Sequence, residues 1–185
     1  MWRASSKVKF PSMPMTPEAV VRAWFKEVWD EGREEAIDRL AHANARIHGL
    51  GGPADPPMQG TAEFKKLFRI FRQALGDLQI EVAKTVSEGD HCAAYCRVKG
   101  RHVGDAFGGD PTDRPVEFGG LVIARVSDGR IAEGWNCFDF LGMYQQIGWV
   151  NNPPAPLVKA KAAVRKRASK APKKKTAKMK SRGRR

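Results

Sequence analysis

The stretch best suited to chemistry runs from Gly129 to Gly148, GRIAEGWNCFDFLGMYQQIG. It follows a tight turn, Ser127-Asp128-Gly129, and begins as a predicted strand. The two-residue period of a strand predicts one shared face for Ile131, Glu133, Trp135, Cys137 and Asp139. A carboxylate four residues beyond a tryptophan on such a face is a polar group among large apolar ones. This arrangement is typical of an apolar binding pocket with a single polar group. The alternative is that Asp139 only turns the chain at the end of an edge strand.

An aspartate inside an apolar pocket has the properties of a general acid and base. Burial among apolar groups raises the pKa of a carboxyl toward neutrality, so that it can take up a proton and return it. Such a group can remove a proton next to a carbonyl. Arg125, on the preceding predicted strand, leaves a second interpretation open. If Arg125 faces Asp139, it lowers the pKa of the carboxyl, and the pair is structural or binds an anion.

Two histidines suggest other kinds of site. His102 stands at the end of a predicted strand, where it either shapes the following loop or lines the mouth of the pocket. Metal binding by His91, His102 and acids such as Asp90 or Asp105 has no ligand spacing to support it. We therefore predict no metal site.

The segment 16–31 carries the signals of a helix start. Thr16 is a good N-cap, Pro17 needs no N–H at the first position, and Glu18 lies near the positive helix end. Apolar residues then recur at helical spacing to the end of the segment. We expect its aromatic residues to pack in the core, with Trp24 as a candidate for the pocket wall.

Three further elements are expected before the sheet. They are a short helix over 33–40, a short strand over 45–48 and a helix that begins at Gly60. The apolar face of the last helix includes Phe68, a second candidate for the pocket wall.

Beyond Gly76 the apolar period becomes two, which predicts four antiparallel strands in a meander. Tyr95 and Trp135, on two of these strands, complete the candidates for the wall. Helices gathered before an antiparallel sheet are typical of the α+β class. A strongly curved, mostly antiparallel sheet wrapped over the N-terminal helices would form a cone-shaped barrel with an interior pocket.

The basic character of the chain belongs to its end. Of the 33 Lys and Arg residues, 14 lie between Leu157 and Arg185, which contains no Asp or Glu. The first 156 residues therefore carry 19 basic and 20 acidic side chains, a net charge of −1. Three parts are expected: a flexible arm over 1–15, an α+β domain over 16–150, and a Pro-rich linker with a disordered basic tail over 151–185.

The tail lacks the apolar residues needed for a core, so we expect it to be disordered. Its charge favours non-specific attraction to nucleic acid or another polyanion, weakened by salt. The tail residues that we expect to make these contacts are Lys166, Arg167, Lys173, Lys174 and Lys175. The alternative is a solubilising extension without a partner.

The cysteines and the N-terminus predict a cytoplasmic protein. Cys92, Cys96 and Cys137 form neither an even set nor a metal-binding spacing, and we expect three reduced thiols. The first residues lack the apolar core of a secretory signal, and no window is apolar enough for a membrane span.

Several motifs occur in an order that resembles a known family. They are ALGDLQIEV from Ala74, SEGD from Ser87, RHVGDAFGGDPTDRPV from Arg101, and DGRIAEGWNCFD from Asp128 with a following QIG. Over roughly residues 16–150, the chain resembles the SnoaL-like polyketide and ester cyclases of the nuclear-transport-factor-2-like superfamily.

The resemblance implies a cone-shaped α+β barrel, often dimeric through its sheet, that closes rings without a metal or cofactor. It places the acid/base carboxylate at Asp139 and expects a polar partner on the preceding strand, which reads LVIAR here and has no histidine. The implied function is a cyclase- or isomerase-type enzyme acting on a small, apolar, polyketide-like carbonyl compound. The alternative is a small-ligand-binding module without catalysis, tethered to nucleic acid by the tail; a purely structural dimer is a third possibility.

Overall fold

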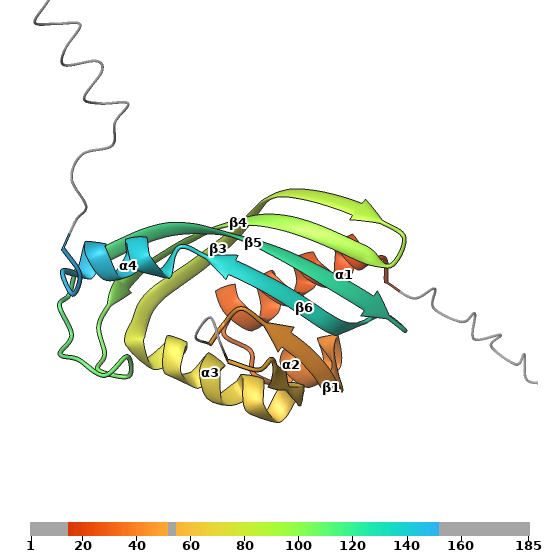
Figure 1. Ribbon diagram of the computed structural model, residues 1–185, viewed down its shortest axis with the longest axis horizontal. Helices are drawn as coiled ribbons and strands as arrows, with labels where there is room; N and C mark the ends of the chain where they lie inside the picture. The colour runs from red at the N-terminus through yellow and green to blue at the C-terminus, as the bar shows by residue number, and fades with distance from the viewer. Residues whose placement is uncertain (1–14, 52–54, 152–185) are drawn as a thin grey trace, which may run out of the picture. The chain divides into compact units, whose positions relative to one another are not determined.

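The computed structural model describes residues 15–51 and 55–151 of the chain. The predicted arm up to residue 14 and the tail from residue 152 lie outside these ranges, so their predicted disorder and contacts stay predictions. Within the described residues, helices and one mixed sheet form the expected α+β fold (Figure 1).

The first predicted helix is present but changes its winding halfway. It starts as the α-helix α1 (Pro17–Ala23), where the Ala19 N–H donates to the Thr16 hydroxyl at 3.2 Å as the cap signals predicted. It continues as the π-helix η1 (Trp24–Asp30), which the apolar periodicity did not predict. The predicted second helix is α2 (Glu35–Leu40), two residues shorter at its start than expected.

A six-stranded sheet follows in the order β2-β1-β6-β5-β4-β3. Its strands are β1 (Ala41–His48), β2 (Met58–Gln59), β3 (Leu75–Glu88), β4 (His91–His102), β5 (Pro115–Ser127) and β6 (Arg130–Phe138). The predicted meander of β3 to β6 is confirmed, and among the strands of the described residues only β1 and β6 pair in parallel. The short strand β2 was not predicted.

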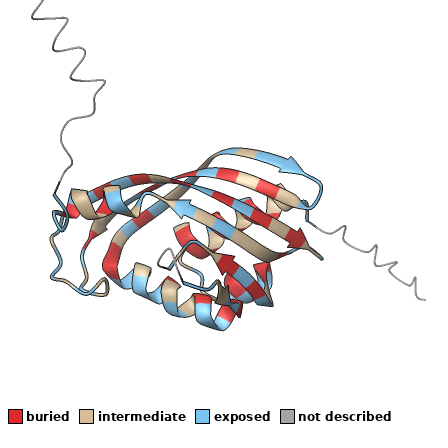
Figure 2. Cartoon of the chain, viewed as in Figure 1, coloured by how far each residue is buried: buried red, intermediate tan, exposed pale blue. Residues whose placement is uncertain are grey.

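The sheet curves over the helices, as Figure 1 shows, with α3 (Gly60–Ala74) beneath it. Buried and exposed residues alternate along the strands in Figure 2, because successive side chains point to opposite faces. On β4 the buried set includes Cys92, Ala94, Cys96 and Val98, which follow one another at intervals of two residues. The sheet therefore has a concave face toward the helices and a convex face away from them.

The face predicted for β6 is wrong at its start, because the strand carries a β-bulge. Arg125 pairs with Glu133, whereas the next residue of β5, Val126, pairs with Ile131. The extra residue of β6 shifts the alternation, so Ile131 is buried while Trp135 is partly exposed.

The chain after β6 forms the helix α4 (Phe140–Ile147). It ends at Gly148, whose φ of 86° is the left-handed conformation that glycine adopts easily. No helix in the described ranges is long and apolar enough to cross a membrane.

Candidate functional site

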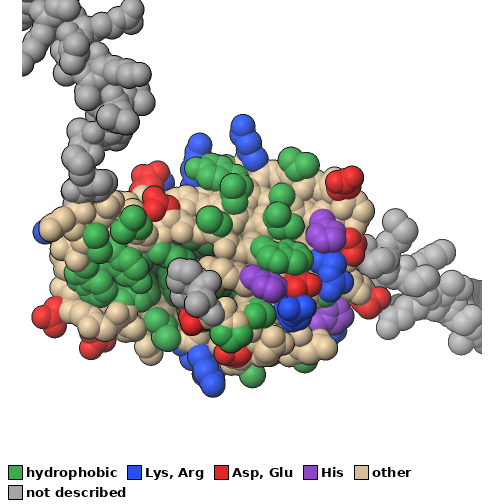
Figure 3. All heavy atoms as spheres, viewed as in Figure 1, with side chains coloured by type: hydrophobic (Ala, Val, Ile, Leu, Met, Phe, Trp, Pro, Cys, Tyr) green, Lys and Arg blue, Asp and Glu red, His purple; other side chains and the backbone are tan. Residues whose placement is uncertain are grey.

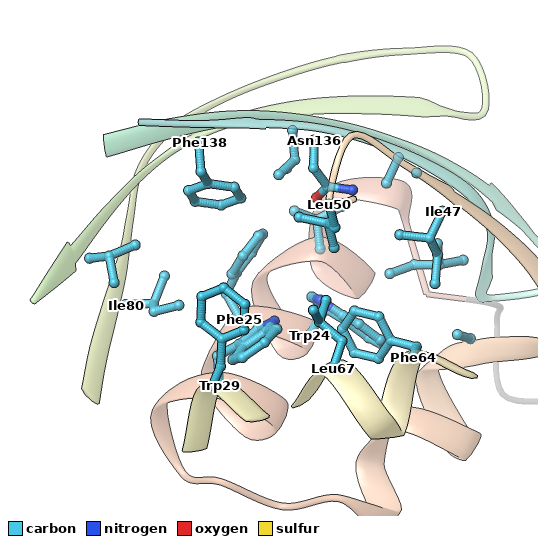
Figure 4. A pocket seen from close by; sticks show the side chains of 18 of the residues that line it. Trp24, Phe25, Trp29, Ile47, Leu50, Phe64, Leu67, Ile80, Asn136 and Phe138 are labelled. Atoms are coloured by element: carbon cyan, nitrogen blue, oxygen red, sulfur yellow. The ribbon is translucent and has the colours of Figure 1, made fainter. Parts of the chain in front are cut away.

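A cavity lies between the concave face of the sheet and the helices (Figure 4). It encloses about 890 Å³, counting the open space at its mouth. Its walls are almost wholly apolar and include eight aromatic side chains, those of Trp24, Phe25, Trp29, Phe64, Phe71, Phe118, Phe138 and Phe140. No ionisable side chain of the described residues lines it. Such a cavity suits an apolar ligand, because burying an unpaired charge in it is costly.

The aromatic rings of the helices fix one side of the cavity. Trp24 packs at a tilt on Phe64, with ring centroids 5.0 Å apart. Trp29 meets the same ring edge-on at 5.8 Å and lies 5.5 Å from the ring of Phe68. These contacts restrain both indoles, so the wall is largely formed before a ligand arrives.

Among the described residues that line the cavity, Asn136 is the one with a polar side chain other than the two tryptophans. It extends from β6 into the cavity between Phe138 and the β1 side, as Figure 4 shows. Its amide nitrogen donates to the backbone carbonyl of His48 at 3.0 Å. Because a carbonyl only accepts, this bond fixes which end of the amide is nitrogen and leaves one N–H and the amide oxygen for a ligand.

The structure places Asp139 outside the cavity lining. It is the N-cap of α4, where its Oδ1 accepts the Gly142 N–H at 2.8 Å, and its own N–H donates to the Gly119 carbonyl at 3.0 Å. The residue is exposed. Its neighbours in sequence, Phe138 and Phe140, both line the cavity. The pocket predicted around Asp139 is therefore not formed in this conformation, and its acid/base role stays a prediction.

Two other predicted site residues, Trp135 and Arg125, lie on the convex face. Trp135 stacks on the His48 ring, with centroids 5.4 Å apart and planes at 6°. The sequence left open whether Arg125 pairs with Asp139. In the structure Arg125 pairs instead with Glu133, at 3.7 Å. Neither Trp135 nor Arg125 lines the cavity.

Glu133 is the centre of this convex-face cluster. His48 Nε2 lies 2.8 Å from its carboxylate, and Arg46 lies 3.5 Å away. The hydrogen bond from His48, supported by Arg46 and Arg125, holds the pKa of Glu133 below its ordinary value. Figure 3 shows histidine, basic and acidic side chains gathered over the β1 and β6 end of the molecule.

Of the remaining wall candidates, only Trp24 lines the cavity. Phe68 is buried and packs against the ring of Trp29, but it does not line the cavity. Tyr95 is partly exposed on the convex face, where it pairs across strands with Leu121. The alternation of β4 explains this position, because Ala94 and Cys96 on either side of Tyr95 take the buried face.

His102 is buried and shapes the loop that follows it. Its Nδ1 accepts the Thr112 N–H at 3.2 Å, which ties the two ends of the loop together. Its ring stacks on Phe107 and meets Trp149 edge-on. His102 does not line the cavity, so the loop-shaping interpretation describes its position. Among the described residues, no three His, Cys, Asp or Glu side chains gather as a metal site would require.

One polar group of the cavity, Asn136, was missed by the sequence analysis. The alternation of β6 contained a signal for it, since Asn136 shares a face with Gly134 and Phe138 once the bulge is passed. Trp29 was expected to pack in the core with the other aromatic residues of the segment 16–31, and the structure places it both in the core and in the cavity wall.

Fold and cavity together define a cone-shaped α+β protein of the nuclear-transport-factor-2-like type, with room for a small molecule. The chain belongs to the SnoaL-like polyketide cyclase family, whose family model matches residues 19–147. The family supports a cyclase- or isomerase-type function. The family predicted from the motifs is thereby confirmed.

Individual relatives agree with this assignment. The chain is 32% identical over 126 residues to nogalonic acid methyl ester cyclase of Streptomyces nogalater, covering 65% of this chain and 89% of the relative. It is similar to the crystal structure of IdmH from Streptomyces antibioticus, with 29% identity, a TM-score of 0.63 and coverage of 72% and 99%. A protein of ketosteroid isomerase-like fold from Catenulispora acidiphila, 17% identical with a TM-score of 0.60, covers 76% of this chain and 100% of its own and shows the fold alone.

Proposed function

We propose that the cavity binds a small, largely apolar carbonyl compound of the polyketide class and that the chain cyclises or isomerises it. The observation that carries ligand binding is the apolar cavity with the Asn136 amide directed into it. The cyclase named among the relatives supports the type of reaction and the class of substrate.

In the proposed reaction Asp139 is the general base. The bond between hydrogen and the carbon next to the carbonyl breaks, the proton passes to the carboxylate, and the electron pair moves to the carbonyl oxygen as an enolate. The enolate carbon then attacks a second carbonyl of the same molecule, and the proton returns to the new alkoxide. The Asn136 amide, held by the His48 carbonyl, supplies one hydrogen-bond donor to an oxygen of the substrate.

This role requires a movement of Asp139. Its carboxylate must leave the Gly142 N–H and turn inward between Phe138 and Phe140, which line the cavity on either side of it in sequence. The cost is that of an N-cap, about 1 kcal/mol, which substrate binding can supply.

A second candidate function is ligand binding without catalysis. It is favoured by the absence of ionisable side chains from the described cavity lining and by the exposed capping position of Asp139. In this case, the same cavity holds the compound and releases it unchanged.

Native mass spectrometry of the full-length protein separates the two functions. Wild type and Asp139→Asn are exposed to a metabolite extract of the source cells; asparagine is a matched control because it also caps helices. We expect the variant to retain a small molecule that the wild type converts. The same unaltered molecule on both proteins would establish binding without catalysis, and no retained molecule would contradict the proposed cavity function.

We also propose a homodimer through the convex face of the sheet. Tyr95, Leu121, Ile123 and Trp135 form exposed apolar positions there, and Leu121 is 58% exposed. Leu121→Asp should shift the protein toward the monomer in sedimentation equilibrium, because the interface would have to bury the new charge. An unchanged mass for this variant would contradict the proposed interface.

The basic tail remains a proposed tether to nucleic acid or another polyanion. Its 14 basic residues without an acid are the supporting observation. Binding of the full chain to duplex DNA should fall steeply with salt, and removal of residues 157–185 should abolish it. Equal binding by the two proteins at low salt would contradict the tether.

A further inference from the structure

The π-helix η1 brings the two tryptophans of the cavity to the same side. Trp24 and Trp29 are five residues apart, and in an α-helix that spacing would turn their side chains about 140° away from each other. In a π-helix the hydrogen bonds run over five residues, as in the bond from the Glu31 N–H to the Lys26 carbonyl at 2.9 Å. Both rings therefore line the cavity, Trp24 with 8% and Trp29 with 9% of its surface exposed.

The indole N–H groups of these tryptophans have no partner among the described residues. His102 Nε2 is the one side-chain nitrogen or oxygen in the described ranges that is both sealed from solvent and without a hydrogen bond. The two indole nitrogens thus reach open space, and Figure 4 shows them at the cavity-facing ends of their rings. Both tryptophans are more than nine-tenths buried and their N–H groups have no protein acceptor in the described ranges, so a ligand in the cavity can supply one.

We propose that the N–H groups of Trp24 and Trp29 form a donor pair that binds a carbonyl oxygen of the ligand. An indole N–H only donates, so the pair favours a ligand with an acceptor over a hydrocarbon without one. This inference rests on the proposed use of the cavity. In the proposed reaction, the same two donors face the oxygen that becomes negatively charged, the arrangement of an oxyanion hole.

The contacts behind the rings make this arrangement rigid. Phe64 contacts both indoles, and Phe71 meets Trp29 edge-on with centroids 6.0 Å apart. The donors are therefore held in place without the ligand, which lowers the entropic cost of binding it. The Asn136 amide is the third polar group of the cavity, and it comes from β6 rather than from the helix.

Two matched probes test the donor pair on the full-length protein. Methyl naphthyl ketone carries the acceptor, and ethylnaphthalene has nearly the same shape without it. Trp24→Phe and Trp29→Phe each remove one N–H and keep an aromatic ring. Each substitution should lower the affinity for the ketone about five-fold, which corresponds to one net hydrogen bond. The affinity for the hydrocarbon should stay within about two-fold of the wild-type value.

A control variant shows whether the effect is specific. Trp135→Phe removes an indole from the convex face and should change neither affinity. Asn136→Leu removes the amide that the proposed function also assigns to an oxygen of the ligand, so it separates the contribution of the amide from that of the indoles. If Asn136→Leu weakens binding of the ketone while Trp24→Phe and Trp29→Phe leave it within about two-fold, the donor is the amide and the inference is wrong.

The carbonyl stretch of isotope-labelled ketone gives a readout that packing changes do not move. In the wild-type complex it should lie at the low frequency of a hydrogen-bonded carbonyl, and in the doubly substituted Trp24→Phe, Trp29→Phe protein it should rise toward its value in hexane. A hexane-like frequency in the wild type would overturn the inference without any variant. Equal losses of ketone and hydrocarbon would overturn it as well. If neither probe binds the wild type, the proposed cavity function fails together with it.

Discussion

On β5, Val122 faces the cavity and is almost fully buried, whereas its neighbour Leu121 faces outward and is 58% exposed. The same strands thus build two surfaces of different character. The cavity between the concave face and the helices has three polar side chains with unused hydrogen-bonding capacity among its described lining residues, Asn136 from the sheet and two tryptophans from η1, which suits a ligand. On the convex face, the carboxylate of Glu133 is satisfied by His48, Arg46 and Arg125. The comparison teaches that the candidate site is marked by polar side chains with hydrogen-bonding groups left free, rather than by charged side chains.

Cysteine reactivity should give the largest contrast between the faces. Cys96 lies on the buried face, where burial raises the pKa of its thiol to about 12, whereas Cys137 is exposed. Thiol labelling near neutral pH should favour Cys137 over Cys96 by more than about a thousand-fold, because Cys96 must wait for opening of the fold. Peptide mapping after timed alkylation measures the ratio, and comparable rates would show that the concave face opens easily.

The second largest difference between the faces should be the loss of stability that a new carboxylate causes. Val98→Asp puts a carboxylate into the cavity wall and should cost about 3–5 kcal/mol in the free energy of unfolding. Lys99→Asp is the matched control on the neighbouring outward residue, where it removes an ion pair with Glu117 at 3.6 Å. It should cost less than about 1 kcal/mol. Urea denaturation gives both values, and similar losses would contradict the assignment of the two faces.

Removing the N-cap of α4, at the edge between the faces, should have a smaller effect on the free energy of unfolding. Asp139→Ala removes the acceptor of the Gly142 N–H and should lower the free energy of unfolding by about 1 kcal/mol. Asp139→Asn keeps a capping group and should cost only a few tenths of that. Thermal denaturation of the two variants provides the comparison. An unchanged midpoint for the alanine variant would mean that this cap does not stabilise the helix.

Substitution of Glu133 on the convex face should have the smallest effect on stability, and this effect should depend on pH. Its pKa in the folded protein is lowered from 4.5, so its carboxylate stabilises the fold above that pH, and the contribution is lost as the pH falls through the lowered pKa. Glu133→Gln should therefore be less stable than wild type near neutral pH, and the difference should shrink below pH 4.5. Urea denaturation across this range measures the difference. Glu81→Gln, which removes an exposed carboxylate 3.7 Å from Arg97, is the control and should change less.

Local signals predicted the elements well where the pattern was strong. The caps at Thr16, the period of two on β4 and the turn at Asp128 and Gly129 all appear as expected. The candidate site was harder to predict, because a side chain's face depends on register. One extra residue at the bulge near Arg125 changed the face of the start of β6, and no local pattern marked it.

The sequence by itself determined the family, the α+β class and the apolar nature of the interior, because periodicity and motif order are properties of the chain. Only the tertiary structure decided which polar groups meet. It placed Asp139 at a helix cap, directed Asn136 into the cavity and, through a π-helix, turned Trp24 and Trp29 to one side. The physical reason is that winding and register are set by packing between elements far apart in sequence, and a change of one residue in either redirects a side chain.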